Sequence, residues 1–316
     1  MSDPNAHGPV ADLRYRSYDG PLIHRRARWW IIARRTLLGV VRRPLFWVLC
    51  AIACFPWLAH VMKLYFTANL PAGTPSFVPR FEHEVLAGEF YQAGRSQSIL
   101  VFLVALMIGS GSVAADNRAN ALLVYLSKPI TRADYIIGKL AAIMMAVGGV
   151  VLAPGLLFYF YCAASMWGKP EFTADPWLLL RLAGAALVTA LVYGSVALCC
   201  SALSRNPRMA GAAFAALFFL TDIASSGIWL LRSGGRRDQF VLLQHLSLDG
   251  IVLGISQSIY QIDVHIRGMR RRAMAWNELV ISPPDIWWLA GIALCVVGVS
   301  LWIAILKVRA VEVVRG

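Results

Sequence analysis

Two long apolar runs enclose a charged loop in the stretch SILVFLVALMIGSGSVAA (residues 98–115), DNRANALLVYLSKPITRADYIIGK (116–139) and LAAIMMAVGGVVLAPGLLFYFYCAASM (140–166). Each run is long enough to cross a hydrocarbon core roughly 30 Å thick as a helix. The loop between them is polar and has a pattern of its own. The stretch therefore predicts two membrane spans joined by an organised connection.

The same length criterion finds six spans in the whole sequence. The chain has 316 residues, 58% hydrophobic and 15% charged, and its mean hydropathy of +0.61 is too high for an ordinary soluble domain. We therefore predict an all-α membrane protein with six transmembrane helices, in which residues 44–316 form the transmembrane domain. The apolar runs occupy residues 45–62, 98–115, 140–166, 177–203, 209–231 and 286–306.

The distribution of Lys and Arg predicts the orientation, because the transfer of cationic loops across a membrane is disfavoured. If the N-terminus is cytoplasmic, the cytoplasmic segments hold 18 of the 30 Lys and Arg residues, and the opposite side holds eleven. Nine of the 18 precede the first span, where no cleavable signal is recognised. The count favours an N-in, C-in, multi-pass protein of the inner (cytoplasmic) cell membrane.

The N-terminal region changes character at His24. Residues 1–23 form a flexible tail, whereas residues 24–43 interleave Arg with Trp and aliphatic residues. This pattern predicts an amphipathic helix in the membrane interface, with anionic lipid as its partner. The alternative is that these Arg residues only flank the first span as a topogenic signal. We attribute the net charge of +13 to binding of anionic lipid, and we expect no nucleic-acid partner.

Two longer segments are predicted on the outer side. Residues 63–97 are interpreted as a partly helical loop. Residues 232–285 mix apolar pieces with the basic run RGMRRR and are interpreted as short amphipathic helices on the outer membrane surface. A re-entrant pair is the alternative for this second segment.

The central loop predicts a short helix followed by a second helix start. Ala119, Leu122, Leu123 and Leu126 recur at helical spacing, so residues 117–126 are expected to form a helix with one apolar face, which Pro129 ends. Thr131 and Asp134 have the spacing of a capping box that begins the helix of the third span. A helix at the membrane surface suits docking; the alternative is a simple connection, although 24 residues is long for one.

This loop resembles that of the permease subunits of ABC-2 type transporters. The resemblance rests on Ser127, Pro129, Ile130, Thr131, Arg132, Gly138 and Lys139, which follow the small-residue run GSGSVAAD. It implies a cytoplasmic coupling helix between the second and third spans that docks on a separate ABC ATPase, and a second permease copy, identical or not. Many members have Glu before the helix, where this chain has Asp116. The implied docking residues are Asp116, Asn117, Arg118, Leu122, Leu123, Leu126, Ser127, Pro129 and Arg132.

The sequence contains no G-x-x-x-x-G-K-[ST] phosphate loop, so ATP and Mg are expected in the partner ATPase and not in this chain. No catalytic residue, metal ligand or cofactor is predicted here. The resulting prediction is a transport subunit, not an enzyme, of an ATP-driven exporter.

Two other function classes are alternatives. A membrane-embedded enzyme acting on lipid or peptide needs a cluster of His, Asp, Glu or Cys at one membrane depth, and the predicted spans offer essentially one carboxylate. An ion-coupled secondary transporter is disfavoured because no inverted repeat is apparent.

Three kinds of residue within the spans are singled out. Asp222 lies about 14 residues into the fifth span and is a candidate for the substrate path; the alternative places it near the outer interface. Arg181 is expected to reach the outer interface in a structural role. Pro56 and Pro154 are expected to bend their helices.

Overall fold

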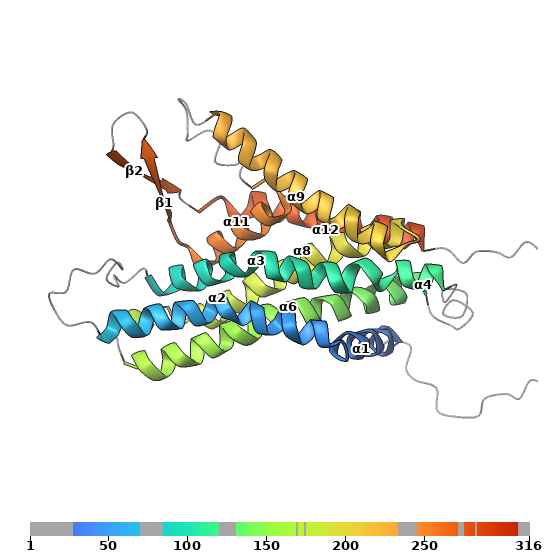
Figure 1. The fold of residues 1–316 in the computed structure, drawn as a ribbon, viewed down its shortest axis with the longest axis horizontal. Coiled ribbons are helices and arrows are strands. Elements are labelled where there is room, and N and C mark those ends of the chain that lie inside the picture. Colours follow the sequence, from blue (N-terminus) through green and yellow to red (C-terminus); the bar gives the residue numbers. More distant parts are fainter. Residues whose placement is uncertain are drawn as a thin grey trace, which may run out of the picture.

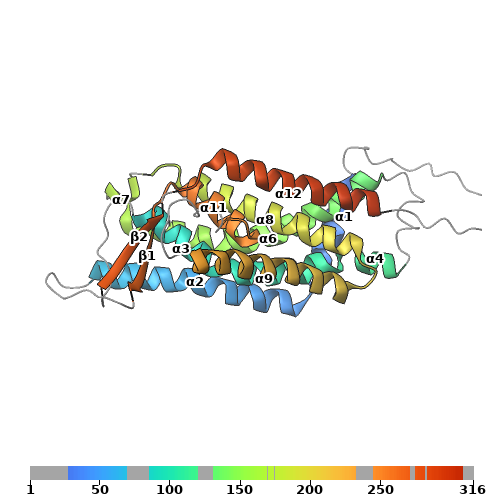
Figure 2. The same cartoon turned by 90° about the horizontal axis from the view of Figure 1, so that it is seen from above.

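The computed structural model describes residues 28–69, 85–119, 131–168, 170–173, 175–232, 245–270, 275–281 and 283–308. Six helices there are long and apolar enough to cross a membrane, and they run along the long axis of the molecule (Figure 1, Figure 2). The prediction of six spans in a multi-pass membrane protein is confirmed. The helices are α2 (Pro44–Asn69), α3 (Val85–Ser112), α6 (Arg132–Met166), α8 (Leu178–Leu203), α9 (Pro207–Arg232) and α12 (Ile286–Lys307).

Two helices extend well beyond the predicted spans. α2 continues to Asn69, and α3 begins at Val85, so parts of the predicted outer loop 63–97 are helical. The polar residues Glu89 and Gln97 lie in this extension and are buried. A hydropathy window marks only apolar residues, whereas a helix continues wherever its polar side chains find partners.

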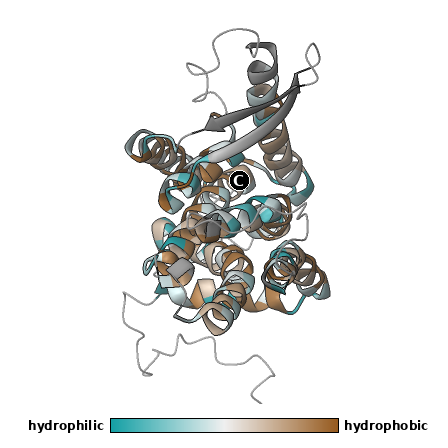
Figure 3. Ribbon diagram, turned by 90° about the vertical axis from the view of Figure 1, so that its left-hand side faces the viewer, coloured by the Kyte–Doolittle hydropathy of each residue, from teal (hydrophilic) through white to brown (hydrophobic). Residues whose placement is uncertain are grey.

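α8 is the centre of the bundle. In the apolar 18-residue stretch of α8, 72% is buried, whereas the corresponding share is 17% in α2 and 22% in α9. α8 packs against α3, α6, α9 and α12, so it is shielded on most sides. The outer helices instead expose large apolar side chains such as Phe55, Leu220 and Trp302, as a surface in contact with lipid requires. Figure 3 views the bundle from one end and shows hydrophobic segments on the peripheral helices.

A helix precedes the first span. α1 (Arg28–Val41) packs against α6 and buries Ile32, Ala33 and Val40, while Arg34 and Arg35 remain exposed. The chain then turns at Arg42 and Arg43 before α2 begins. The structure thus has a helix within the predicted range 24–43; its location in the membrane interface stays a prediction. A four-residue helix, α7 (Pro170–Thr173), lies between α6 and α8.

The outer segment differs from its prediction. Within residues 232–285 the structure describes a helix, α11 (Leu248–Tyr260), and an antiparallel hairpin of β1 (Val264–Arg270) and β2 (Ala275–Ile281). The expectation of surface helices only was wrong, and within the described residues the fold is all-α apart from this hairpin. β-branched residues explain the strands: Val264 and Ile266 in β1, Val280 and Ile281 in β2.

α11 lies inside the bundle beside the outer part of α8. At its start, the Tyr193 hydroxyl of α8 donates to Asp249 Oδ1 at 2.7 Å. At its end, Arg181 Nη1, twelve residues earlier on α8, donates to the Tyr260 carbonyl at 3.0 Å. The start of α11 therefore lies at the depth of Tyr193, and the helix runs outward from there toward the hairpin (Figure 1). α11 is one helix of the re-entrant alternative; a second member of such a pair would fall outside the described residues.

Candidate functional site

The candidate site is the base of the central loop, where α3 and α6 approach each other. α3 is followed at once by a short helix, α4 (Ala114–Arg118), which holds Asp116, Asn117 and Arg118. Residues 120–130 lie outside the described part of the chain. The predicted positions Leu122, Leu123, Leu126, Ser127 and Pro129 fall there, so the coupling helix over residues 117–126 stays a prediction.

The start of α6 has the predicted capping box. Thr131 Oγ1 accepts from the Asp134 backbone N–H at 3.1 Å, and Asp134 Oδ2 accepts from the Thr131 backbone N–H at 3.2 Å. These bonds satisfy donors that a helix N-terminus otherwise leaves unpaired. α6 therefore begins at Arg132, whose side chain is exposed beside the loop.

An ion pair between a buried lysine and a partly exposed aspartate joins the two ends of the loop. Asp116 Oδ2 accepts from Lys139 Nζ at 2.8 Å and from the Tyr135 hydroxyl at 2.6 Å. The Lys139 side chain is only 8% exposed, and its ammonium lies 5.5 Å from the centre of the Tyr135 ring. A buried charge is tolerated only when it is paired and hydrogen-bonded, which this arrangement provides. Lys139 thus ties α4 to α6.

α1 crosses α6 in close contact at Gly138. A Cβ atom at Gly138 would lie 2.7 Å from the Trp29 carbonyl oxygen and 2.9 Å from Ile32 Cβ. Both distances are too short for a side chain, so glycine is required for α1 to pack this closely. The adjacent residues Gly138 and Lys139 therefore connect α6 to α1 on one side and to α4 on the other.

The junction between α3 and α4 is held by a serine of α8. The helix is interrupted at Val113, and Ser201 Oγ accepts from the backbone N–H groups of Val113 and Ala114, each at 3.0 Å. The same hydroxyl donates to the Ser110 carbonyl at 2.9 Å. Ser201 thereby satisfies the backbone groups of the junction.

Of these features, the loop pattern predicted the capping box; the ion pair of Asp116 and Lys139, the crossing at Gly138 and the bonds of Ser201 were not predicted. The family resemblance of the loop was compared with known protein families. The family model described as ABC-2 family transporter protein matches residues 10–234, which is more than half of the chain. The chain belongs to the ABC-2 transporter family. It is accordingly a membrane permease of an ABC transporter, a transport subunit, and the predicted resemblance is confirmed. A search of curated proteins found no match.

The family match includes the first five spans of the permease. It ends at residue 234, before α11, the β-hairpin and α12. The site at the loop base lies inside the matched region, whereas the outer segment lies beyond it.

The substrate-path candidate Asp222 lies on α9 and is half-buried. Its neighbour Thr221 accepts from the Leu248 backbone N–H at 3.4 Å, at the start of α11. Among the described residues no Lys or Arg forms an ion pair with Asp222. The structure therefore brings Asp222 to the start of α11 in the permease; a role in the substrate path stays a proposal.

Arg181 is bound by protein groups. Its guanidinium pairs with Asp175 Oδ2 at 2.9 Å and donates to the Tyr260 carbonyl and to Gln261 Oε1, the latter at 3.1 Å. Gln261 ends α11 in the left-handed conformation, with a φ of 55°. The predicted structural role is thus fulfilled by fixing the outer end of α11 and not by contact with the lipid interface.

The sequence analysis missed two polar links in the outer half of the permease. Glu89 of α3 binds His60 and Lys63 of α2, and Gln97 of α3 binds Trp57 of α2. A signal existed for the first link: His60 and Lys63 are one turn apart on one helix face, opposite in charge to Glu89. No comparable sequence signal identifies Gln97.

Proposed function

We propose that this permease is the membrane-spanning subunit of an ATP-driven exporter, and that the loop between α4 and α6 receives a separate ABC ATPase. ATP and Mg bind in that partner, and two permease copies pair in the membrane. The single observation that supports the docking assignment is the ion pair between Asp116 and the buried Lys139. It joins the two ends of the loop at one end of the bundle, which the proposal assigns to the cytoplasmic side.

Force applied to the loop is expected to reach two spans together. α4 continues from α3 through a junction held by Ser201, and α6 begins at the capping box of Thr131. Because the Asp116–Lys139 pair joins these elements, a displacement of the docking helix moves α3 and α6 at the same time. α1 follows α6 because the two helices are in close contact at Gly138.

The proposal includes anionic lipid at α1. The exposed side chains Arg34, Arg35, Arg42 and Arg43 stand beside exposed Trp30, Ile31 and Leu38. Cationic and apolar side chains exposed together suit the headgroup region of an anionic leaflet, which is the cytoplasmic one. This supports the N-in, C-in orientation in an inner cell membrane.

The orientation is tested with reporter tags. A tag after Gly316 and one within residues 117–127 are expected to report the cytoplasm, whereas tags near Thr74 and Gly268 are expected to report the outside. A cytoplasmic signal at Gly268 would contradict the six-span arrangement.

The docking proposal is tested by charging the apolar face of the loop helix. Leu122→Asp with Leu126→Asp places two carboxylates in a contact expected to be desolvated, and burying one Leu is worth roughly 1.5–3 kcal/mol. Capture of the ATPase should fall by orders of magnitude, since every 1.4 kcal/mol is about tenfold in affinity. The permease should still accumulate in the membrane.

The matched control adds the same charges to the opposite face, as Asn120→Asp with Val124→Asp. This variant should capture the ATPase nearly as well as the unmodified chain. Equal capture by both double variants, with transport retained, would show that the predicted helix is not the docking element. The purified permease alone should hydrolyse no ATP, and turnover without a partner would overturn the subunit assignment.

A further inference from the structure

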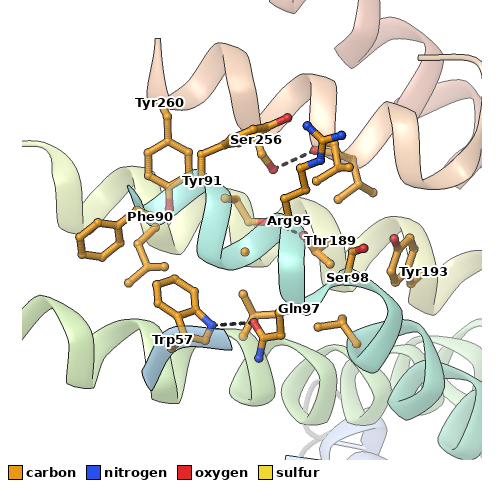
Figure 4. A pocket seen from close by; sticks show the side chains of 17 residues that line it. Trp57, Phe90, Tyr91, Arg95, Gln97, Ser98, Thr189, Tyr193, Ser256 and Tyr260 are labelled. Atoms are coloured by element: carbon orange, nitrogen blue, oxygen red, sulfur yellow. Dashed lines mark hydrogen bonds between the residues drawn. The ribbon is translucent and has the colours of Figure 1, made fainter. Parts of the chain in front are cut away.

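Gln97 of α3 is fully buried between α2 and α6, with an exposed fraction of 0%. Its Oε1 accepts from Trp57 Nε1 at 2.9 Å, and its Nε2 donates to the carbonyls of Ala53 at 3.1 Å and Val150 at 2.9 Å. Figure 4 shows Gln97 and Trp57 joined at the wall of a cavity of about 40 Å³. Carbonyls only accept and an indole N–H only donates, so a single orientation of the amide satisfies all three partners.

The two carbonyls bound by Gln97 each lie one turn before a proline. In an α-helix the N–H of each residue bonds to the carbonyl four residues earlier, and proline has no N–H. Pro154 therefore leaves the Val150 carbonyl without a helical donor, and Gln97 supplies one. Ala53 lies three residues before Pro56. The carbonyl that lacks a helical donor because of Pro56 is that of Ile52, so the bond to Ala53 joins Gln97 to α2 without replacing a missing donor.

The same level of the bundle is closely packed. A Cβ atom at Gly155 would lie 2.7 Å from Leu182 Cδ1 and 3.3 Å from the Trp57 ring, so α6 approaches its neighbours closely just after Pro154. On the outer side of this point, the rings of Trp57 and Phe158 lie 5.8 Å apart. α2 and α6 are thus joined by apolar contact directly next to the polar link of Gln97.

We propose that Gln97 is a positioning residue that joins α2 to α6 at the level of Pro56 and Pro154, so that the outer halves of these helices move as one unit during transport. Without Gln97, the Val150 carbonyl is buried without the donor that Pro154 cannot supply, and the Trp57 indole N–H loses its acceptor. The coupling of motion rests on the proposed ATP-driven transport, whereas the hydrogen-bond link does not.

The link is tested by a double-mutant cycle on the purified full-length chain. Gln97→Leu should lower the melting temperature by roughly 3–6 °C, because buried polar groups lose their partners. In a Pro154→Ala background, Gln97→Leu should lower the melting temperature by about half as much. The reason is that the backbone N–H of the new alanine bonds to the Val150 carbonyl. Pro207→Ala is the matched control, because a proline in the first turn of a helix removes no needed donor. Gln92→Leu on the same helix controls for the loss of an amide.

Equal losses of melting temperature in the Pro154→Ala and Pro207→Ala backgrounds would overturn the role of Gln97 as the donor that Pro154 cannot supply to the Val150 carbonyl.

If Gln97→Leu alone does not accumulate, the amount of protein in the membrane is measured instead. Recovery in the double variant with Pro154→Ala, and not with Pro207→Ala, is then the supporting result. Absence of that difference overturns the proposal.

The motion is tested in the complex with the ATPase, reconstituted in lipid nanodiscs. Deuterium uptake is compared with and without ATP and vanadate over residues 57–69 of α2 and 155–166 of α6. Both segments should respond together in the unmodified protein. In Gln97→Leu, the response of one segment should fall at least fivefold while ATP hydrolysis persists. A joint response in that variant would overturn the coupling. If no ATPase binds the unmodified chain, the proposed function is overturned. The hydrogen-bond link of Gln97 is then tested by the double-mutant cycle of melting temperatures alone.

Discussion

Charged side chains tie α3 and its continuation α4 to neighbouring helices at both ends of the bundle, but the two links differ in exposure. At the loop base, the Lys139 side chain is 8% exposed and that of Asp116 20%; at the opposite end, Lys63 is 35% exposed and Glu89, which also binds His60, only 6%. A lysine that loses its carboxylate therefore stays desolvated at the loop base, whereas at the opposite end it recovers much of its hydration. Loss of the carboxylate should therefore cost more at the loop-base link than at the opposite link.

The largest effect is expected at the loop-base link. Asp116→Leu leaves the buried Lys139 ammonium without its carboxylate and should destabilise the permease by about 3 kcal/mol, measured by unfolding in mixed micelles. Adding Lys139→Met removes the orphaned charge and should recover most of that loss. A double variant no more stable than Asp116→Leu would show that the unpaired charge is not the cause.

The next effect concerns the α3–α4 junction. Ser201→Ala deprives two buried N–H groups of their acceptor and should cost about 2 kcal/mol in the same assay. Ser195→Ala is the matched control, since Ser195 is equally buried on α8 but bonds only to Val192 of its own helix. Equal losses from the two substitutions would mean that Ser201 does not hold the junction.

A smaller effect is expected at the start of α6. Thr131→Ala removes the side-chain acceptor of the capping box and should cost about 1 kcal/mol. Amide exchange should accelerate over residues 132–135, and Thr131→Ser should preserve protection because it keeps the hydroxyl. Unchanged exchange in Thr131→Ala would argue against a contribution of the cap to the loop base.

The smallest effect is expected at the opposite link. Glu89→Leu should cost about 1 kcal/mol or less, because the released Lys63 is partly exposed and regains water. The unfolding assay used for Asp116→Leu applies unchanged. A loss as large as that of Asp116→Leu would contradict the view that exposure of the lysine separates the two links.

Hydropathy and local spacing were sufficient for the parts of the fold that depend on neighbours in sequence. The six spans follow from apolar length, and the capping box of Thr131 and Asp134 follows from a spacing of three residues. The family resemblance likewise came from a contiguous loop. The ion pair of Asp116 and Lys139 lies at the two ends of that loop, yet its burial depends on how α4 packs against α6.

Features that depend on distant contacts were not predicted. α11 has only 13 residues, too few to count as a span, so its position inside the bundle had no hydropathy signal. Gln97 is a polar residue at the edge of an apolar run, and only the proximity of Pro154, more than 50 residues away, gives it a role. Gly138 likewise depends on α1, which crosses α6 from over 100 residues earlier in the chain.

The length of α6 has a mechanical consequence. Its 35 residues extend about 52 Å at 1.5 Å per residue, whereas the hydrocarbon core is roughly 30 Å thick. Some 20 Å of the helix must therefore project beyond the acyl chains or be accommodated by tilt, and the loop proposed to receive the ATPase joins it at its N-terminal tip. Such a rod behaves as a lever, because a small angular change at the tip becomes a displacement of several ångströms at the far end. Pro154 divides this lever into a long inner arm and a short outer arm.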